Sequence, residues 1–335
     1  MLKNKILLIA ILIASCGGGG GMSSDNSNDP MTPGSSITPC DTANITNIIL
    51  NSRNSDCAQS QYADNCTIAY VRDLNRALDF TANTSLKVSS DMNSCTLSVD
   101  AIPNHDFNDS SASFATNVME VNRSFTIKRN PMLVSENTQI DGRSWDAVMV
   151  NGVVVDIKSN GCYQPTEPRA NADGNIASNC PRNAEWNLVP LEYKSMFRVD
   201  MHNAHVQPDG TYHYHGNPNA LFDDSPSGDG SPVIGWAADG FPIYGSYILE
   251  ESTGTYRKAI SGYTLKTGSR GEKNNTNPGG QYTGIYEEDW EWTNSGDLDE
   301  CNGMTYKNQY GYYVTDKYPY IINCFKGTPD SSFAK

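Results

Sequence analysis

Basic residues and long apolar runs are scarce in this chain of 335 residues. Lys and Arg number 24 against 38 Asp and Glu, which gives a formal net charge of −14 at pH 7. A surface with this charge repels phosphate backbones, so no nucleic acid is expected as a partner. Beyond the N-terminus, no apolar run approaches the roughly 20 residues that a membrane-spanning helix needs. The rest of the chain is therefore not expected to span a bilayer.

Helical periodicity is scarce as well, and alternation of apolar and polar residues prevails. Residues 147–150 and 153–155 are apolar, and Asn151-Gly152 between them favours a hairpin with a type I′ turn. Further short strands are expected at 96–99, 124–127, 211–215, 233–237, 242–248, 261–266 and 310–314. The sequence therefore predicts a mainly β fold, sandwich-like or irregular, with long loops and disulfides.

The segment 39–90 is an exception to this pattern. Asn65 is a typical helix cap. Apolar residues follow it at helical spacing, namely Ile68, Val71, Leu74 and Leu78. The pattern predicts a small, partly helical, disulfide-containing unit that precedes the main domain at residues 91–328.

The N-terminus has the layout of a secretory signal. Lys3 and Lys5 form a positive region, an apolar stretch follows, and Ile13-Ala14-Ser15 precede Cys16. This arrangement resembles the lipobox of bacterial lipoproteins, in which the cysteine becomes the lipidated N-terminus. The resemblance implies a signal peptide at residues 1–15 and acyl chains on Cys16. The alternative is an ordinary signal peptide with an accidental cysteine.

Residues 16–38 are rich in Gly, Ser, Asn and Pro, a composition that predicts a flexible tether. In bacterial lipoproteins, an aspartate directly after the cysteine directs the protein away from the outer membrane. Gly17 stands at this position, so the same resemblance favours the outer membrane. We therefore expect an exported lipoprotein of the cell envelope that contacts the membrane through its lipid anchor.

Nine cysteines are present, and eight remain when Cys16 is set aside. An even number in an exported chain predicts four disulfides. Two neighbouring pairs, Cys162–Cys180 and Cys301–Cys324, would each close a loop of roughly 20 residues and stabilise the fold by about 3 kcal/mol. The other four would pair among themselves in one of three connectivities: Cys40, Cys57, Cys66 and Cys95. A thiolate metal site is the alternative, but no Cys-x-x-Cys spacing supports it.

Only five histidines occur, and four of them lie between residues 202 and 215. Side chains alternate along a strand, so His213 and His215 would project from one face, about 7 Å apart along the backbone. Pro208-Asp209-Gly210 is a turn sequence that would bring His205 near this pair. Neutral imidazoles without a thiolate suit Zn²⁺ or Cu²⁺ better than Mg²⁺ or Ca²⁺. The pattern predicts a transition-metal site; the alternative is polar strand residues without a ligand role.

Tyr212-His213-Tyr214-His215 is also part of a wider pattern. Other distinctive segments accompany it: Ile102–His105, Asn151–Val153, Ala204–Gly210, Ile234–Gly245, Asp297–Gly303, Tyr318–Tyr320 and Cys324–Gly327. Together, over about residues 95–328, these segments resemble the YHYH-domain proteins, a family named after the four-residue motif. The resemblance implies no established reaction.

The resemblance distinguishes among the histidines. Four of them match histidines of the family pattern: His105, His205, His213 and His215. His202 does not match one, and it is a candidate to support the site from outside the set of ligands. The resemblance therefore implies that four histidines form one metal site for copper or zinc, with His105 supplied by a distant segment.

The resemblance also implies a degraded internal repeat, in which residues 210–215 are echoed by residues 309–315. Gly311 and Tyr313 stand where histidines would be in the second copy, so a second histidine site is not expected. Tyr313 is instead a candidate ligand or hydrogen-bond partner for the first site.

Several carboxylates are candidates to orient the ligand histidines. Ligating imidazoles usually donate their second N–H to a carboxylate or a carbonyl. Asp297, Asp299 and Asp239 are candidates for this role, although Asp239 also fits a turn in which its side chain bonds its own backbone. The acidic run 287–291 predicts a solvated surface rather than a Ca²⁺ site.

The sequence thus favours a lipid-anchored, extracytoplasmic protein that binds a transition metal through its histidines, by an unknown reaction if it is an enzyme. One alternative is a surface module without metal, whose histidines and tyrosines form a core network and whose loops recognise glycans or proteins. A hydrolase with one histidine as general base ranks last, because no nucleophile motif is present.

Overall fold

Two large sheets and four small ones make up the fold in the part of the chain that the computed structural model describes, residues 52–59, 66–89, 91–181 and 183–335. The first large sheet is antiparallel, with the order β1-β2-β3-β4. Its strands are β1 (Cys66–Asp73), β2 (Leu78–Val88), β3 (Ser94–Val99) and β4 (Arg123–Lys128). Its pairing of β2 with β3 joins residues on both sides of position 90, the expected end of the small N-terminal unit.

The second large sheet has eight strands, in the order β10-β11-β7-β6-β12-β13-β19-β18. Its strands are β6 (Ala147–Met149), β7 (Val154–Val155), β10 (Ala204–Val206), β11 (Tyr212–Tyr214), β12 (Val233–Ala237), β13 (Pro242–Tyr244), β18 (Gly303–Tyr306) and β19 (Gln309–Tyr313). It is mixed, because β7 pairs with β11 and β13 pairs with β19 in parallel.

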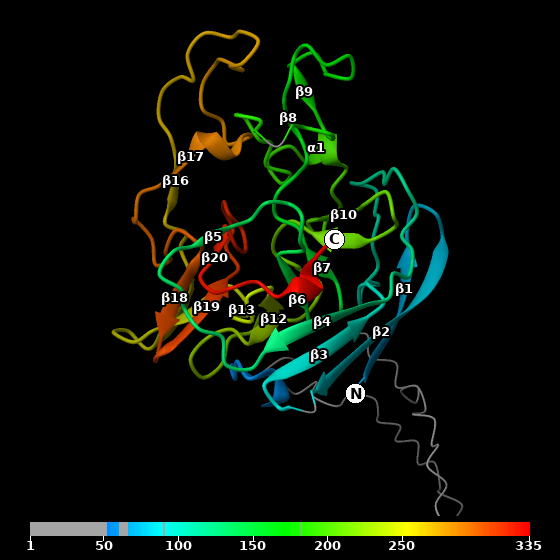
Figure 1. Ribbon diagram of the computed structural model, residues 1–335, viewed down its shortest axis with the longest axis vertical. Coiled ribbons are helices and arrows are strands. Elements are labelled where there is room, and N and C mark those ends of the chain that lie inside the picture. The colour runs from blue at the N-terminus through cyan, green and yellow to red at the C-terminus, as the bar shows by residue number, and fades with distance from the viewer. Residues whose placement is uncertain (1–51, 60–65, 90, 182) are drawn as a thin grey trace, which may run out of the picture. The chain divides into compact units, whose positions relative to one another are not determined.

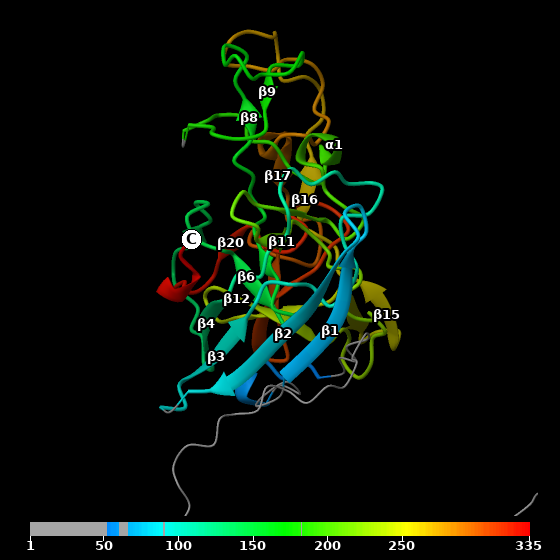
Figure 2. The ribbon, with the colours of Figure 1, turned by 90° about the vertical axis from the view of Figure 1, so that its right-hand side faces the viewer.

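The remaining elements are short. Two-stranded sheets pair β5 (Thr138–Gln139) with β20 (Cys324–Phe325), β8 (Cys162–Tyr163) with β9 (Asn175–Ile176), β14 (Tyr247–Glu250) with β15 (Thr255–Lys258), and β16 (Tyr263–Leu265) with β17 (Trp290–Trp292). One short α-helix is present in the described residues, α1 (Lys194–Phe197). Three 3₁₀ helices accompany it: η1 (Cys57–Gln59), η2 (Glu287–Asp289) and η3 (Ser331–Phe333). Figures 1 and 2 show β8, β9 and α1 at the end of the molecule away from β3 and β4.

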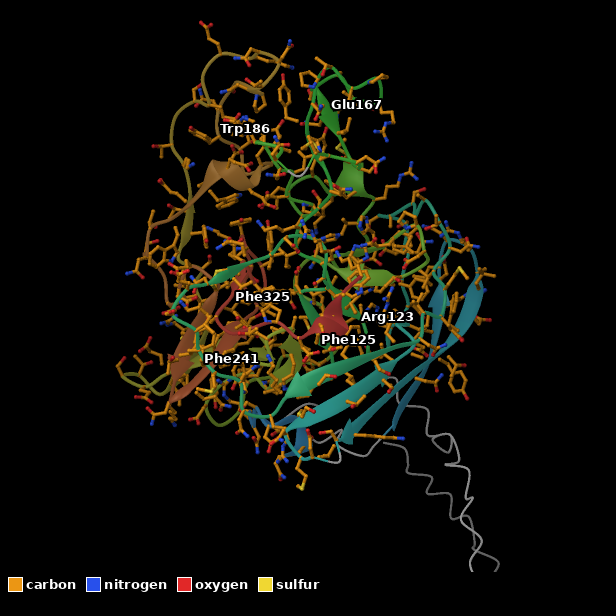
Figure 3. The ribbon with its side chains drawn as sticks, viewed as in Figure 1. Arg123, Phe125, Glu167, Trp186, Phe241 and Phe325 are labelled. Atoms are coloured by element: carbon orange, nitrogen blue, oxygen red, sulfur yellow. A yellow bond between two sulfur atoms is a disulfide. The ribbon has the colours of Figure 1, made fainter. Side chains whose placement is uncertain are left out.

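Both large sheets contribute to one apolar core. The strands at the middle of the eight-stranded sheet are covered on both faces, so all residues of β6, β7 and β12 are buried, which explains their nearly continuous apolar sequence. Phe125 of β4, labelled in Figure 3, packs on Phe333 of the C-terminal η3, with ring centroids 4.7 Å apart.

The helix expected after Asn65 is a strand, β1, which pairs with β2 over its full length. Along β1, Val71 is buried between the exposed Tyr70 and Arg72, which is the period of a strand. Leu74, at 46% exposure, lies in the turn that follows the strand. β-Branched and aromatic residues and pairing with β2 therefore outweigh the apparent helical spacing. The prediction of a partly helical N-terminal unit is wrong in this respect.

The hairpin of β6 and β7 forms as expected, but its turn is different. Gly152 has a φ of 86°, whereas Asn151 is not in the left-handed region. Gly152 N donates to Met149 O at 2.9 Å, so a tight turn is followed by a glycine bulge rather than a type I′ pair. The Asn151 side chain accepts from Val153 N at 3.2 Å, which fixes the turn.

The structure has three disulfides in its described part, Cys57–Cys95, Cys162–Cys180 and Cys301–Cys324. The last two are the pairs that the spacing predicts. Cys40 and Cys16 lie outside the described residues, as do the signal and tether, and the side chain of Cys66 is not described. Among the described residues, the structure has no helix of the length and apolarity that a membrane crossing requires.

Candidate metal centre

The histidine cluster is built on the pairing of β10 with β11. His205 lies directly opposite His213 in the antiparallel register. The turn between the strands contains Gly210, whose φ of 92° favours glycine, and Asp209, whose carboxylate accepts from Thr211 N at 3.0 Å. A local turn and two short strands thus place His205 and His213 side by side.

Three imidazoles converge at this point. His213 Nε2 lies 3.1 Å from His215 Nε2, and His215 Nε2 lies 3.1 Å from His205 Nε2. One nitrogen from each ring lies within 4.8 Å of the other two. Two nitrogens bound to one tetrahedral Zn²⁺ at about 2.0–2.1 Å would lie about 3.3 Å apart. The spacing therefore matches a shared metal ion.

Backbone carbonyls fix two of these rings. His205 Nδ1 lies 2.5 Å from Phe197 O, and His213 Nδ1 lies 3.2 Å from Thr211 O. A carbonyl only accepts, so each Nδ1 carries the proton and each Nε2 presents a lone pair to the centre of the cluster. Both lone pairs face His215, whose single Nε2 proton can satisfy only one of them, whereas one cation satisfies all three nitrogens.

The cluster is poised in the neutral form that metals bind. His213 and His215 are 1% and 2% exposed, and burial, together with the neighbouring imidazoles, holds the pKa of each well below 6.5. Burial also lowers the pKa of His205. At neutral pH the rings therefore carry no excess proton to release, and metal binding requires only that the His215 proton lie on Nδ1 rather than on Nε2.

A cleft of about 860 Å³ gives access to the cluster. The three histidines line it together with Gln207, Asp156 and Lys335. Asp156 Oδ2 accepts from Gln207 Nε2 at 3.0 Å and from Lys335 Nζ at 2.5 Å, while its Oδ1 is buried without a partner in the described part of the chain. The site is thus buried at its ligands and open on one side.

Neither Asp156 nor Lys335 is among the residues that the sequence singles out. Asp156 follows the apolar run 153–155, and alternation along that strand would have placed it on the same face as Val154, which pairs with His213. Lys335, far along the chain, gives no such signal. Sequence reasoning also misses the carbonyls of Phe197 and Thr211, since any residue type supplies a carbonyl.

His105 is not part of the cluster, and its prediction as a fourth ligand there is wrong. Its Nε2 lies 2.7 Å from Tyr214 Oη, and its Nδ1 lies 2.8 Å from Asp106 O. Tyr214 alternates with His213 along β11 and projects from the opposite face. His105 therefore lies on the tyrosine face of the strand, where its ring packs against that of His202 at a tilt of 43°, with centroids 4.2 Å apart.

The carboxylates expected to orient the histidines also have other partners. Asp297 forms a two-pronged ion pair with Arg257, with both N–O distances 2.7 Å. Asp299 accepts from Cys301 N at 2.9 Å and from Tyr310 Oη at 3.1 Å. Among the described residues, neither carboxylate contacts the histidine cluster, so the expectation that they orient the ligand histidines is wrong.

Asp239 and Tyr313 likewise serve other parts of the fold. Asp239 accepts from Phe241 N at 3.2 Å, as its turn role predicts, and from Tyr312 Oη at 2.6 Å. Tyr313 stacks on Tyr244 at 5.0 Å instead of approaching the first site. These contacts all lie on β13, on β19 and in the turn before β13, which are remote from β10 and β11 in the strand order.

A search of curated proteins finds no match to this chain, and neither does a search of solved structures. One family model matches, described as YHYH protein, over residues 124–327. The matched region holds β10, β11 and the whole histidine cluster, and it excludes His105. Because it covers more than half of the 335 residues, the chain belongs to the YHYH protein family.

Proposed function

We propose that this protein binds one transition metal ion, copper or zinc, through His205, His213 and His215. The observation that carries the proposal is the meeting of three imidazoles, in which the Nε2 atoms of His205 and His213 each lie 3.1 Å from that of His215. Backbone carbonyls bonded to Nδ1 of His205 and His213 force these two rings to present the Nε2 lone pair. Imidazole ligands suit both metals. Three ligands leave a coordination position open towards the cleft, which is the arrangement of metals that act as Lewis acids.

Metal analysis of the purified protein tests this site. We expect about one equivalent of copper or zinc per chain, and none in His213→Ala/His215→Ala, because a single remaining imidazole holds a metal weakly. His105→Ala/His202→Ala is the matched control, since it removes two histidines from the other face of the strand and should keep the metal. Equal metal in the native chain and in His213→Ala/His215→Ala would refute the proposal and favour a metal-free surface module.

We further propose that the protein acts outside the cytoplasm, held to the cell envelope by lipid on Cys16. The small residues before Cys16 and the Gly- and Ser-rich stretch after it support this proposal. We expect the full chain to incorporate labelled palmitate during growth and to fractionate with outer membranes, and Cys16→Ser to do neither. Label retained in Cys16→Ser would show that the anchor lies elsewhere.

A further inference from the structure

The eight-stranded sheet consists of two halves with the same topology. In the first half β6 and β7 form a hairpin, β11 pairs in parallel with β7, and β10 pairs antiparallel with β11. In the second half β12 and β13 form a hairpin, β19 pairs in parallel with β13, and β18 pairs antiparallel with β19. The halves meet where β6 pairs antiparallel with β12, and Val148 lies opposite Trp236. The equivalent strands of the two hairpins are thus related by a local two-fold axis.

The first hairpin turn has a close counterpart in the second half. Gly152 and Gly240 both adopt positive φ, 86° and 93°. The preceding residues, Asn151 and Asp239, each accept a hydrogen bond from the backbone N–H two positions later, at 3.2 Å in both halves. Asn151 Nδ2 also bonds the hydroxyl of a tyrosine of β11 at 3.1 Å, and Asp239 accepts from a tyrosine of β19 at 2.6 Å.

The turns that enter β10 and β18 also correspond. Asp200 accepts from the backbone N–H groups of residues 202 and 204, and from Tyr212 Oη at 3.0 Å. Asp299 accepts from the backbone N–H groups of residues 301 and 303, and from Tyr310 Oη at 3.1 Å. Shared topology, glycine conformation and side-chain bonding at two separate turns indicate a duplication rather than a chance likeness.

The strand registers then fix which residues of the second half stand at the ligand positions. The pairs are His205 with Met304, His213 with Gly311, and His215 with Tyr313. None of the three residues in the second half is a histidine. The duplicated half therefore lacks the donor set that the first half presents.

Other side chains fill the space instead. A Cβ built on Gly311 would lie 2.5 Å from Cε2 of Tyr244, so the Tyr244 ring takes the room that a His213-like side chain would need. The guanidinium of Arg53 lies 4.2 Å from the centroid of that ring and donates to Tyr313 Oη at 3.0 Å. It also donates to the carbonyl of Ser231.

The chain segments that bring a cation to each half correspond as well. Trp145 N donates to Phe333 O at 2.8 Å beside the first site, and Val233 N donates to Ser52 O at 2.9 Å beside the second. The first segment delivers Lys335 to the carboxylate beside the histidines. The second delivers Arg53 into the tyrosine-lined space.

We propose that the second half is a converted copy of the metal-binding half, in which Arg53 and Tyr244 close the duplicated site with a built-in cation. The inference rests on the proposed function for the identity of the first site, and on the duplicated topology for the second. It explains why, among the described residues, only one of the two equivalent half-sheets presents a histidine cluster. It also assigns Arg53 the role of fastening the segment that precedes the disulfide at Cys57 to this half of the sheet.

Restoring histidines at the converted positions tests the inference. In Arg53→Ala/Met304→His/Tyr313→His the new imidazoles occupy the positions of His205 and His215. We expect isothermal titration to show one additional equivalent of Zn²⁺. This ion should bind at least tenfold more tightly than to the variants that combine Arg53→Ala with only one of the two new histidines. A folded variant that gains no equivalent would overturn the inference.

The same substitutions placed on His213→Ala/His215→Ala separate the two proposals. If the native cluster binds no metal but the engineered pair does, the proposed function fails, whereas the structural equivalence of the two halves stands. For the two halves to be equivalent, the engineered histidines must bind one further Zn²⁺ ion per chain both with the native histidine cluster present and in His213→Ala/His215→Ala.

Arg53→Ala alone gives a test that does not depend on the engineered site folding. We expect its melting temperature to fall by several degrees, and millimolar methylguanidinium to recover part of that loss by entering the vacated space. The same concentration of urea should recover none, and methylguanidinium should not raise the melting temperature of the native chain. An Arg53→Ala variant that melts with the native chain, or that gains nothing from methylguanidinium, would contradict the role assigned to Arg53.

Discussion

Protein saturated with Zn²⁺ is expected to unfold at a higher temperature than metal-free protein, and His213→Ala is expected to reduce the difference, because only two of the three ligands remain. A ligand that binds only the folded state stabilises it by about 2.7 kcal/mol at 100 times its dissociation constant. For a domain of this size such a gain raises the melting temperature by on the order of 5 °C. His213 is 1% exposed and its Nε2 lies 3.1 Å from that of His215, so its removal breaks the cluster at its buried side. Thermal unfolding followed by circular dichroism measures both values.

The comparison is made within each variant, because loss of a buried imidazole also lowers the stability of the metal-free protein. His105→Ala is the matched control, since it truncates a histidine that bonds Tyr214 on the other face of the same strand. It should lower the melting temperature of both forms and keep their difference. A difference that is undiminished in His213→Ala would show that the metal binds elsewhere.

Acid should weaken this effect only at low pH. Burial and neighbouring imidazoles hold the pKa of His213 and His215 well below 6.5 in the folded chain. Their neutral form therefore persists below the pH at which a free imidazole is half protonated, and protons begin to compete with the metal only under more acidic conditions. We expect the metal-induced rise in melting temperature to be the same at about pH 6 as at about pH 7.5. A fall that already begins near pH 7 would contradict the cluster as described.

The convergence of the three ligands could be predicted from the sequence because it depends on local geometry. Alternation along one short strand aligns His213 with His215, and the turn at 208–210 returns His205 to them. The position of His105 could not be predicted in this way. Its ring is delivered by a loop, and which face of β11 the loop packs on depends on contacts such as the one with Tyr214, which are distant in sequence.

Errors in the fold prediction have the same origin. Near Asn65 a short apolar pattern fits both a helix and a strand, and only the pairing of β1 with β2 decides between them. The acidic run 287–291 is predicted to be a solvated surface, yet Asp289 is fully buried. Its partner, Arg270, lies in a loop without regular structure, so no spacing in the sequence connects the two residues.

Asp289→Ala is expected to lower the free energy of unfolding by about 3–5 kcal/mol, the usual cost of breaking a buried ion pair by removing one partner. The Asp289 carboxylate is 0% exposed and binds the guanidinium of Arg270, which is 5% exposed, through N–O distances of 2.6 and 2.7 Å. It also accepts from Gly284 N at 2.9 Å. Its removal leaves a buried cation and a buried N–H without their acceptor. Equilibrium unfolding in urea measures the loss.

Glu291 provides the control, because it is exposed and belongs to the same acidic run. Glu291→Ala should change the free energy of unfolding by less than about 0.5 kcal/mol. Asp289→Leu combined with Arg270→Met removes both charges and should recover much of the stability that Asp289→Ala loses, because the cost comes from the unpaired cation rather than from the lost contact. If the double variant is as unstable as Asp289→Ala, the backbone donors around Gly284 carry the cost instead. If Asp289→Ala is as stable as Glu291→Ala, the carboxylate is solvated, as the acidic run predicts, and the buried ion pair does not hold this loop.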